Sequence, residues 1–187
     1  MTTYGYKFSW TEIDILRKNW KTLAEKNNGE FKTINVHSIA DKNDVTSRKF
    51  ELRIPFLEST IIFFSTEFKP LKISYLLHSV NFNEFLIYPE DFTDRIGKLF
   101  GLKELEIGDK IFDRSFIIKA ENEEFLKRVL TTEMRNYLLQ NAISNFKLEK
   151  IEEGSNLEMN LMINELENSK MIELLSIFKN CVTNIKR

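Results

Sequence analysis

A short stretch in the second half of the chain holds the residues best placed to do chemistry. Asp109, Asp113 and Arg114 lie close together in the sequence, so two carboxylates and one guanidinium share a turn. Such a group could bind a cation or a charged ligand. The alternative is structural, because Gly108 and Asp109 are typical of a turn, and Asp113 would then bind loop amides or pair with Arg114. We favour the structural interpretation and keep the ligand site as a hypothesis.

Other acidic and metal-ligating residues do not form a recognisable motif. Glu90, Asp91 and Asp94 stand where a helix is expected to begin, and acids there complement the helix dipole. They lack the spacing of a calcium-binding loop. His37 and His78 each follow an apolar segment, yet two histidines are too few ligands for a zinc site. No metal and no cofactor is therefore expected, and the sequence contains no recognisable catalytic set.

Aromatic residues near the N-terminus form a candidate interaction surface. Tyr4, Tyr6 and Trp10 lie close together in the sequence, and such side chains are frequent in interface hot spots. The alternative is that the tyrosines pack over a sheet edge while Trp20 lies in the core. We favour packing and keep the interaction surface as a hypothesis.

Composition argues against several classes of protein. The 27 basic residues nearly balance 28 acidic ones and are interspersed with them, whereas nucleic-acid binding needs a concentrated basic face. The single Cys181 cannot form an internal disulfide, which fits a reducing compartment. The first ten residues do not resemble a secretory signal, and the apolar run at 61–64 is too short to span a bilayer. We expect a soluble cytoplasmic protein without a nucleic-acid or membrane partner.

One globular domain is expected over residues 1–187. With three prolines and six glycines, no flexible linker divides the chain, and the polar run at 40–44 is typical of a surface loop. The 16 phenylalanines predict one thick core. The alternative is an apolar pocket, because pockets are lined by the same residue types.

Amphipathic helices are predicted at both ends of the chain. Ser9 and Glu12 have the spacing of a capping box, and apolar residues follow at steps of three and four. Asn27-Asn28-Gly29 should end this helix, with the glycine in the left-handed conformation. The predicted core residues are Ile13, Leu16, Trp20, Leu23 and Ala24 in the first helix and Met171, Leu174, Leu175, Phe178, Val182 and Ile185 in the last.

The region between them is predicted to be rich in strands. Apolar and polar residues alternate over 50–56 and 71–77, and Phe31, Ile34 and Val36 suggest a strand before them. The apolar run at 61–64 predicts a more deeply buried strand, and residues 85–88 predict a short further strand. The strands follow one another at about ten-residue intervals without a helical crossover, which favours an antiparallel meander.

Further elements are predicted after this meander. They are a short helix from Asp91 to Gly101, a strand over 115–120, helices capped by Asn122 and by Thr131 or Thr132, and a hairpin with its turn at 153–156. Strands gathered in the middle, with helices at intervals, indicate an α+β fold. We expect a curved, mainly antiparallel sheet packed against the N- and C-terminal amphipathic helices.

A family resemblance rests on the stretch from Gly108 to Phe116. It reads Gly-Asp-Lys-Ile-Phe-Asp-Arg-Ser-Phe and is followed by a strand, a helix with an acidic start and the step Leu130-Thr131. This resembles a family of uncharacterised bacterial proteins in which a Phe-Asp-Lys-x-Phe element precedes a short strand and a helix. Here Arg114 stands in place of the lysine. The resemblance implies a similar fold and no catalytic residues.

Three functions remain open at this point. The first is a non-enzymatic intracellular interaction module that binds a protein partner or a second copy of itself, because the core patterns are complete and a catalytic set is not recognisable. The second is a domain that binds a small apolar ligand, such as a lipid or metabolite. The third is an enzyme of unfamiliar type acting through Asp109, Asp113 or a histidine. We favour the first.

Overall fold

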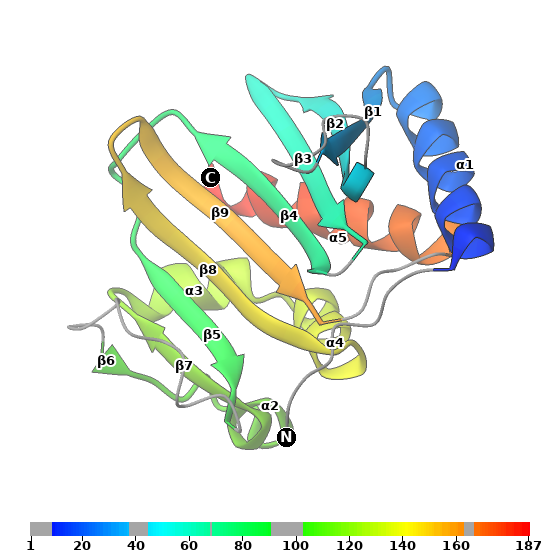
Figure 1. Ribbon diagram of the computed structural model, residues 1–187. Coiled ribbons are helices and arrows are strands. Elements are labelled where there is room, and N and C mark those ends of the chain that lie inside the picture. Colours follow the sequence, from blue (N-terminus) through cyan, green and yellow to red (C-terminus); the bar gives the residue numbers. More distant parts are fainter. Residues whose placement is uncertain (1–8, 38–44, 68, 91–102, 163–166) are drawn as a thin grey trace.

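A computed structural model describes residues 9–37, 45–67, 69–90, 103–162 and 167–187. These residues form a nine-stranded antiparallel sheet with helices against one face (Figure 1). The helices are α1 (Trp10–Lys26), α2 (Lys110–Ser115), α3 (Glu123–Val129), α4 (Thr132–Gln140) and α5 (Asn168–Ile185). The strands are β1 (Glu30–His37), β2 (Val45–Phe56), β3 (Ser59–Thr66), β4 (Lys69–Leu77), β5 (Phe85–Pro89), β6 (Lys103–Glu104), β7 (Phe116–Ala120), β8 (Ile143–Ile151) and β9 (Gly154–Leu161). The predicted α+β class, with helices from both ends of the chain against the sheet, is confirmed.

The sheet order is β1-β2-β3-β4-β9-β8-β5-β7-β6. The first four strands form the predicted meander, but the expectation that β5 continues it is wrong. The β8–β9 hairpin lies next to β4, and β5 pairs with β8 and β7 instead. Alternation of apolar and polar residues fixes which face of a sheet a strand presents, and it does not name the neighbouring strand.

Helix α1 follows its sequence signals closely. Ser9 Oγ accepts a hydrogen bond from the Glu12 amide at 3.3 Å, and the Glu12 carboxylate accepts one from the Ser9 amide at 2.8 Å, which completes the capping box. The buried side chains of α1 are the five that were predicted, and the predicted stripe of α5 is buried as well.

The end of α1 differs from the prediction. Asn28, with φ 52°, takes the left-handed conformation, and Gly29 does not. Glycine is required at position 29 for a different reason, because a Cβ there would lie 2.3 Å from the Arg53 carbonyl oxygen of β2. Close approach to the neighbouring strand therefore excludes a side chain at this position.

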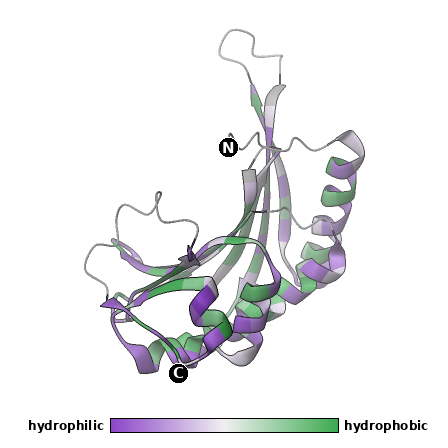
Figure 2. Cartoon of the chain, turned by 90° about the horizontal axis from the view of Figure 1, so that it is seen from below, coloured by the Kyte–Doolittle hydropathy of each residue, from purple (hydrophilic) through white to green (hydrophobic). Residues whose placement is uncertain are grey.

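Large apolar side chains fill the layer between sheet and helices. Trp20 of α1 is 1% exposed and packs edge-on against Phe31 and Phe63, with ring centroids 6.0 and 6.2 Å apart. Phe85 and Phe146 meet at 5.0 Å further along the sheet. Helix α5 contributes Phe178, which is 0% exposed. The phenylalanines thus build the predicted core, and Figure 2 shows from below that the helices lie along one side of the sheet.

Strand β3 is less deeply buried than predicted. Ile61 and Phe63 are fully buried on the helix-covered face, whereas Ile62 and Phe64 are only half-buried on the opposite face. The continuous apolar run suggested two covered faces. The structure instead places apolar side chains on a face where none of the described helices lies.

The β8–β9 hairpin turns earlier than predicted. Ile151 pairs with Gly154, so Glu152 and Glu153 form the turn, and the predicted turn residues 154–156 already belong to β9. Gly154 has φ 148°, and a Cβ there would lie 2.1 Å from the Leu77 carbonyl oxygen of β4. Glycine is therefore needed where β9 begins beside β4.

Two other expectations meet different outcomes. The chain bends at Gly108 as predicted, and after Asp109 it forms the short helix α2, which was not predicted. The predicted helix from Asp91 to Gly101 lies outside the described residues, as do Tyr4 and Tyr6. No helix in the described ranges is long and apolar enough to cross a membrane.

Candidate functional site

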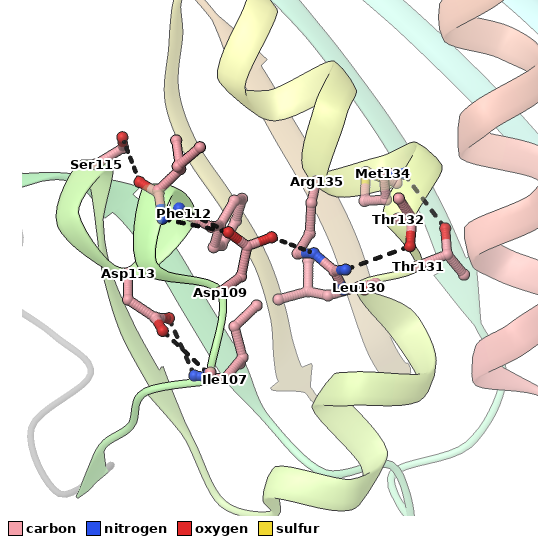
Figure 3. Close-up of polar contacts among 12 residues, drawn as sticks. Ile107, Asp109, Phe112, Asp113, Ser115, Leu130, Thr131, Thr132, Met134 and Arg135 are labelled. Atoms are coloured by element: carbon pink, nitrogen blue, oxygen red, sulfur yellow. Dashed lines mark hydrogen bonds and ion pairs between the residues drawn. The ribbon is translucent and has the colours of Figure 1, made fainter.

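Asp109 stands at the corner where α2 meets α4 (Figure 3). Its carboxylate caps α2 by accepting hydrogen bonds from the amides of Ile111 and Phe112 at 3.2 and 3.3 Å. Its second oxygen accepts a hydrogen bond from Arg135 Nε of α4 at 3.1 Å. Arg135 in turn donates to the Leu130 carbonyl at 2.7 Å. The carboxylate therefore joins two helices that are separate in the sequence.

Asp113 fixes the loop that precedes α2. One carboxylate oxygen accepts a hydrogen bond from the Ile107 amide and the other from the Gly108 amide, each at 3.0 Å (Figure 3). Gly108 has φ 85°, a conformation that glycine adopts readily. Asp113 thus holds the loop by its backbone, which is one of the structural roles considered from the sequence.

Arg114 does not join this cluster. Its side chain is exposed, and no ion pair links it to Asp113 within the described part of the chain. The cationic partner of the cluster is Arg135, which lies 26 positions from Asp109 in the sequence and carries no local signal of this contact. Binding of a ligand by Asp109, Asp113 and Arg114 stays a prediction, and the carboxylate contacts are made to the protein's own groups.

Trp10 is the described member of the predicted aromatic surface. Its side chain is 69% exposed, and the Arg48 guanidinium lies over its ring at 4.4 Å. Arg48 also pairs with Glu67 at 2.7 Å, and Glu67 is 3% exposed. Trp10 therefore packs on an ion pair at the start of α1, while Trp20 is core as expected.

The metal-ligating residue types stay dispersed. Among the residues described, no three His, Cys, Asp or Glu side chains gather closely enough to hold a metal ion. Cys181 is buried on α5, and burial raises the pKa of its thiol strongly, so the thiolate is scarce at neutral pH. The thiol acts as a small apolar side chain.

A second polar centre, which the sequence did not single out, lies on the face of the sheet opposite the helices. We call this the outer face. One row across it consists of residues aligned by strand register, namely Glu30, Arg53, Ile62, Ser74, Glu158, Lys147, Leu86, Lys119 and Glu104. Glu158 stands in the middle of this row.

Glu158 is the most enclosed carboxylate of that row, at 8% exposed. It pairs with Lys72 of β4, and its carboxylate accepts hydrogen bonds from the side-chain amides of Asn160 at 2.7 Å and Asn156 at 3.4 Å. Asn160 donates a further hydrogen bond to Asn145 Oδ1 of β8 at 3.0 Å. We call these five residues the Glu158 network.

The ionisation of Glu158 reflects two opposed effects. Burial raises its pKa, but hydrogen bonds from Lys72 and Asn160 lower it, together with the charges of Lys72 and Lys147. The second group of effects is larger, so the pKa of Glu158 lies below its ordinary value. The carboxylate is therefore charged at neutral pH, and its charge is balanced by the adjacent ammonium groups.

An apolar patch lies beside this network on strands β2, β3 and β4. Pro55 is exposed, and Ile62, Phe64 and Leu76 are half-buried. Ile62 pairs with Arg53 of β2 and Ser74 of β4, which places it diagonally opposite Pro55 and Leu76, and Phe64 follows two positions along β3 on the same face. We call these four residues the outer patch. The continuous apolar run at 61–64 is the sequence signal for two of its members, Ile62 and Phe64.

Comparison with known proteins bears on the fold. No family model and no curated protein matches the chain. The structure is similar to the crystal structure of the mycobacterial trehalose monomycolate transport factor A, TtfA, with a TM-score of 0.56 and 9% sequence identity. The likeness covers 90% of this chain and 95% of that one. At this identity it shows a shared fold alone, and the resemblance of residues 108–116 to an uncharacterised bacterial family stays a prediction.

Proposed function

We propose that the chain is a non-enzymatic interaction module that binds a protein partner on the outer face of its sheet. The observation that carries this proposal is the asymmetry of the sheet. The described helices cover one face, while the other face presents the outer patch, with Phe64 as a half-buried aromatic residue.

The surroundings of the patch support an interface rather than a reaction centre. Arg53 pairs with Glu51 at 2.6 Å on one side, and Lys72 pairs with Glu158 on the other. An apolar centre ringed by polar groups is the usual anatomy of a protein interface. The charges around the patch are already paired, so specificity would come from shape and hydrogen bonds more than from net charge.

Site-specific crosslinking in the cells that produce the protein tests this proposal. A photo-reactive amino acid in place of Ile62 is expected to give a covalent adduct with a partner protein, identifiable by mass spectrometry. The matched control is the same amino acid in place of Ile172, an apolar residue of α5 that is 43% exposed. Phe64→Lys should abolish the adduct while leaving the fold intact, because the side chain is half-buried.

The interaction proposal fails if position 62 gives no adduct, or the same adducts as position 172, while both variants melt like the wild type. An adduct with a second copy of this chain would instead assign the outer face to self-association. Analytical ultracentrifugation of the purified protein separates these two outcomes.

A second candidate is the binding of an apolar ligand, which the fold likeness favours because TtfA is named for the transport of trehalose monomycolate. Trp20 and Phe63 lie buried in the layer between sheet and helices, whereas the outer patch is apolar surface that the described helices leave uncovered. An apolar ligand would therefore lie on the outer patch. Native mass spectrometry of protein purified without detergent tests this candidate, and a spectrum of ligand-free protein alone counts against it.

A further inference from the structure

We propose that the Glu158 network, which adjoins the outer patch at Phe64, is a binding site for a neutral polyhydroxylated ligand, that is, a carbohydrate. The site spans strands β4, β9 and β8 and uses residues other than Ile62, at which the protein partner is tested. It goes beyond the interaction proposed above, and each of the two proposals can fail while the other stands.

The first argument is that the side chains of the network are already held in place. Asn160 donates both of its amide hydrogens, one to Glu158 at 2.7 Å and one to Asn145 at 3.0 Å. Lys72 is fixed by its ion pair with Glu158. Because these side chains are ordered before a ligand arrives, binding costs less conformational entropy.

The second argument is that the network leaves donors and acceptors of both kinds unused. Within the described part of the chain, the Asn145 amide hydrogens, the Asn160 and Asn156 amide oxygens and the remaining Lys72 hydrogens have no protein partner. Adjacent hydroxyl groups each donate and accept hydrogen bonds. A polyhydroxylated ring therefore satisfies neighbouring groups of both kinds, whereas a purely acidic or purely basic ligand does not.

The third argument is charge. Lys72 balances Glu158, and Lys147 pairs with Glu149 at 2.7 Å. A charged ligand would have to compete with these internal ion pairs, so the site favours a neutral one. Phe64 lies opposite Lys72 in the strand register and offers an apolar ring beside the polar groups. Sugar rings present a face of C–H groups that packs against such a ring.

Nuclear magnetic resonance titration of the whole protein tests the site. The probes are methyl α-glucoside, methyl α-galactoside and cellohexaose, together with a glycan array that samples other sugars. At least one sugar should shift the side-chain amide signals of Asn145, Asn156 and Asn160 in a saturable way, with a dissociation constant of about 1 mM or tighter. Asn145→Ala should weaken that binding about tenfold, as expected for the loss of one or two hydrogen bonds.

Variants separate this proposal from the interaction proposal. Ile62→Lys should remove the protein partner and leave sugar binding unchanged, and Asn145→Ala should do the opposite. If Asn160→Ala loses the fold, Asn145→Ala still decides, because Asn145 is half-buried and contributes only an acceptor to the network. The proposal is overturned if no sugar shifts the three amides and no glycan is retained on the array. It is also overturned if glycerol shifts them equally, or if Asn145→Ala binds like the wild type.

Discussion

The two faces of the sheet use the same strands in opposite ways. On the helix-covered face, residues such as Phe63, Phe146 and Phe178 are fully buried, and their contacts hold the layers together. On the outer face, charged and amide side chains bind one another around Glu158 and retain further hydrogen-bonding groups. Because of the period-two alternation of the strands, residues of the outer face can vary without opening the core.

The largest expected effect lies on the helix-covered face. Phe178→Asp places an unpaired carboxylate in the core, and we expect a loss of more than about 4 kcal/mol of stability and insoluble protein. Ile172→Asp changes the same helix at a position that is 43% exposed, and it should melt within a few degrees of the wild type. Soluble yield and thermal melting measure both variants. Normal melting of Phe178→Asp would remove α5 from the core.

Asp113 tests a carboxylate whose hydrogen bonds to the backbone serve stability alone. Asp113→Ala leaves the amides of Ile107 and Gly108 without their acceptors, and we expect a loss of about 1–3 kcal/mol in urea unfolding. Asp113→Asn keeps one side-chain oxygen and should lose less. If the alanine variant is as stable as the wild type, the loop does not depend on this carboxylate.

The contribution of the Glu158 carboxylate to the stability of the fold should depend on pH. The folded-state pKa of Glu158 is lowered, so its stabilisation is present above the unfolded value of 4.5 and is lost as the pH falls through the folded pKa. Glu158→Gln should therefore be less stable near neutral pH, by about 1 kcal/mol, and the difference should shrink below pH 4.5. Urea unfolding across this acid range measures it. A difference that stays constant with pH would show that the charge of Glu158 is not what stabilises the fold.

The smallest effect is expected at Arg114. The side chain is exposed and has no ion pair in the described ranges, so Arg114→Ala should change stability by no more than about 0.5 kcal/mol. Arg135→Ala is the matched variant, because it removes the actual partner of Asp109. Equal losses from the two variants would show that the assignment of Arg135 as that partner is mistaken.

Short sequence patterns predicted the helix caps and amphipathic helices, because these depend on residues close together in the chain. The capping box at Ser9, the cap at Asn122 and the apolar stripes of α1 and α5 were predicted from residues within a few positions of each other. The cap of α4 was narrowed to Thr131 or Thr132, and the structure has Thr131. Periodicity needs no knowledge of the rest of the chain, which is why these predictions are correct.

Contacts between distant residues could not be predicted in the same way. The alternation of apolar and polar residues in its strand predicts that Glu158 faces outward. Nothing nearby in the sequence indicates Lys72 as its partner. Arg135 meets Asp109 only because α4 folds back on α2. The requirement for Gly29 likewise depends on the Arg53 carbonyl of a neighbouring strand. Both candidate sites are set by strand order and helix packing, which one sequence does not state.

The pairing of β4 with β9 has a consequence for synthesis of the protein. The hydrogen bond from Ser155 to the Ser79 carbonyl joins residues 76 positions apart. A ribosome that adds about 5–20 residues per second finishes β4 several seconds before β9 emerges. During that interval β4 exposes the strand edge that β9 later covers, which is the kind of surface on which chaperones act and on which neighbouring chains aggregate.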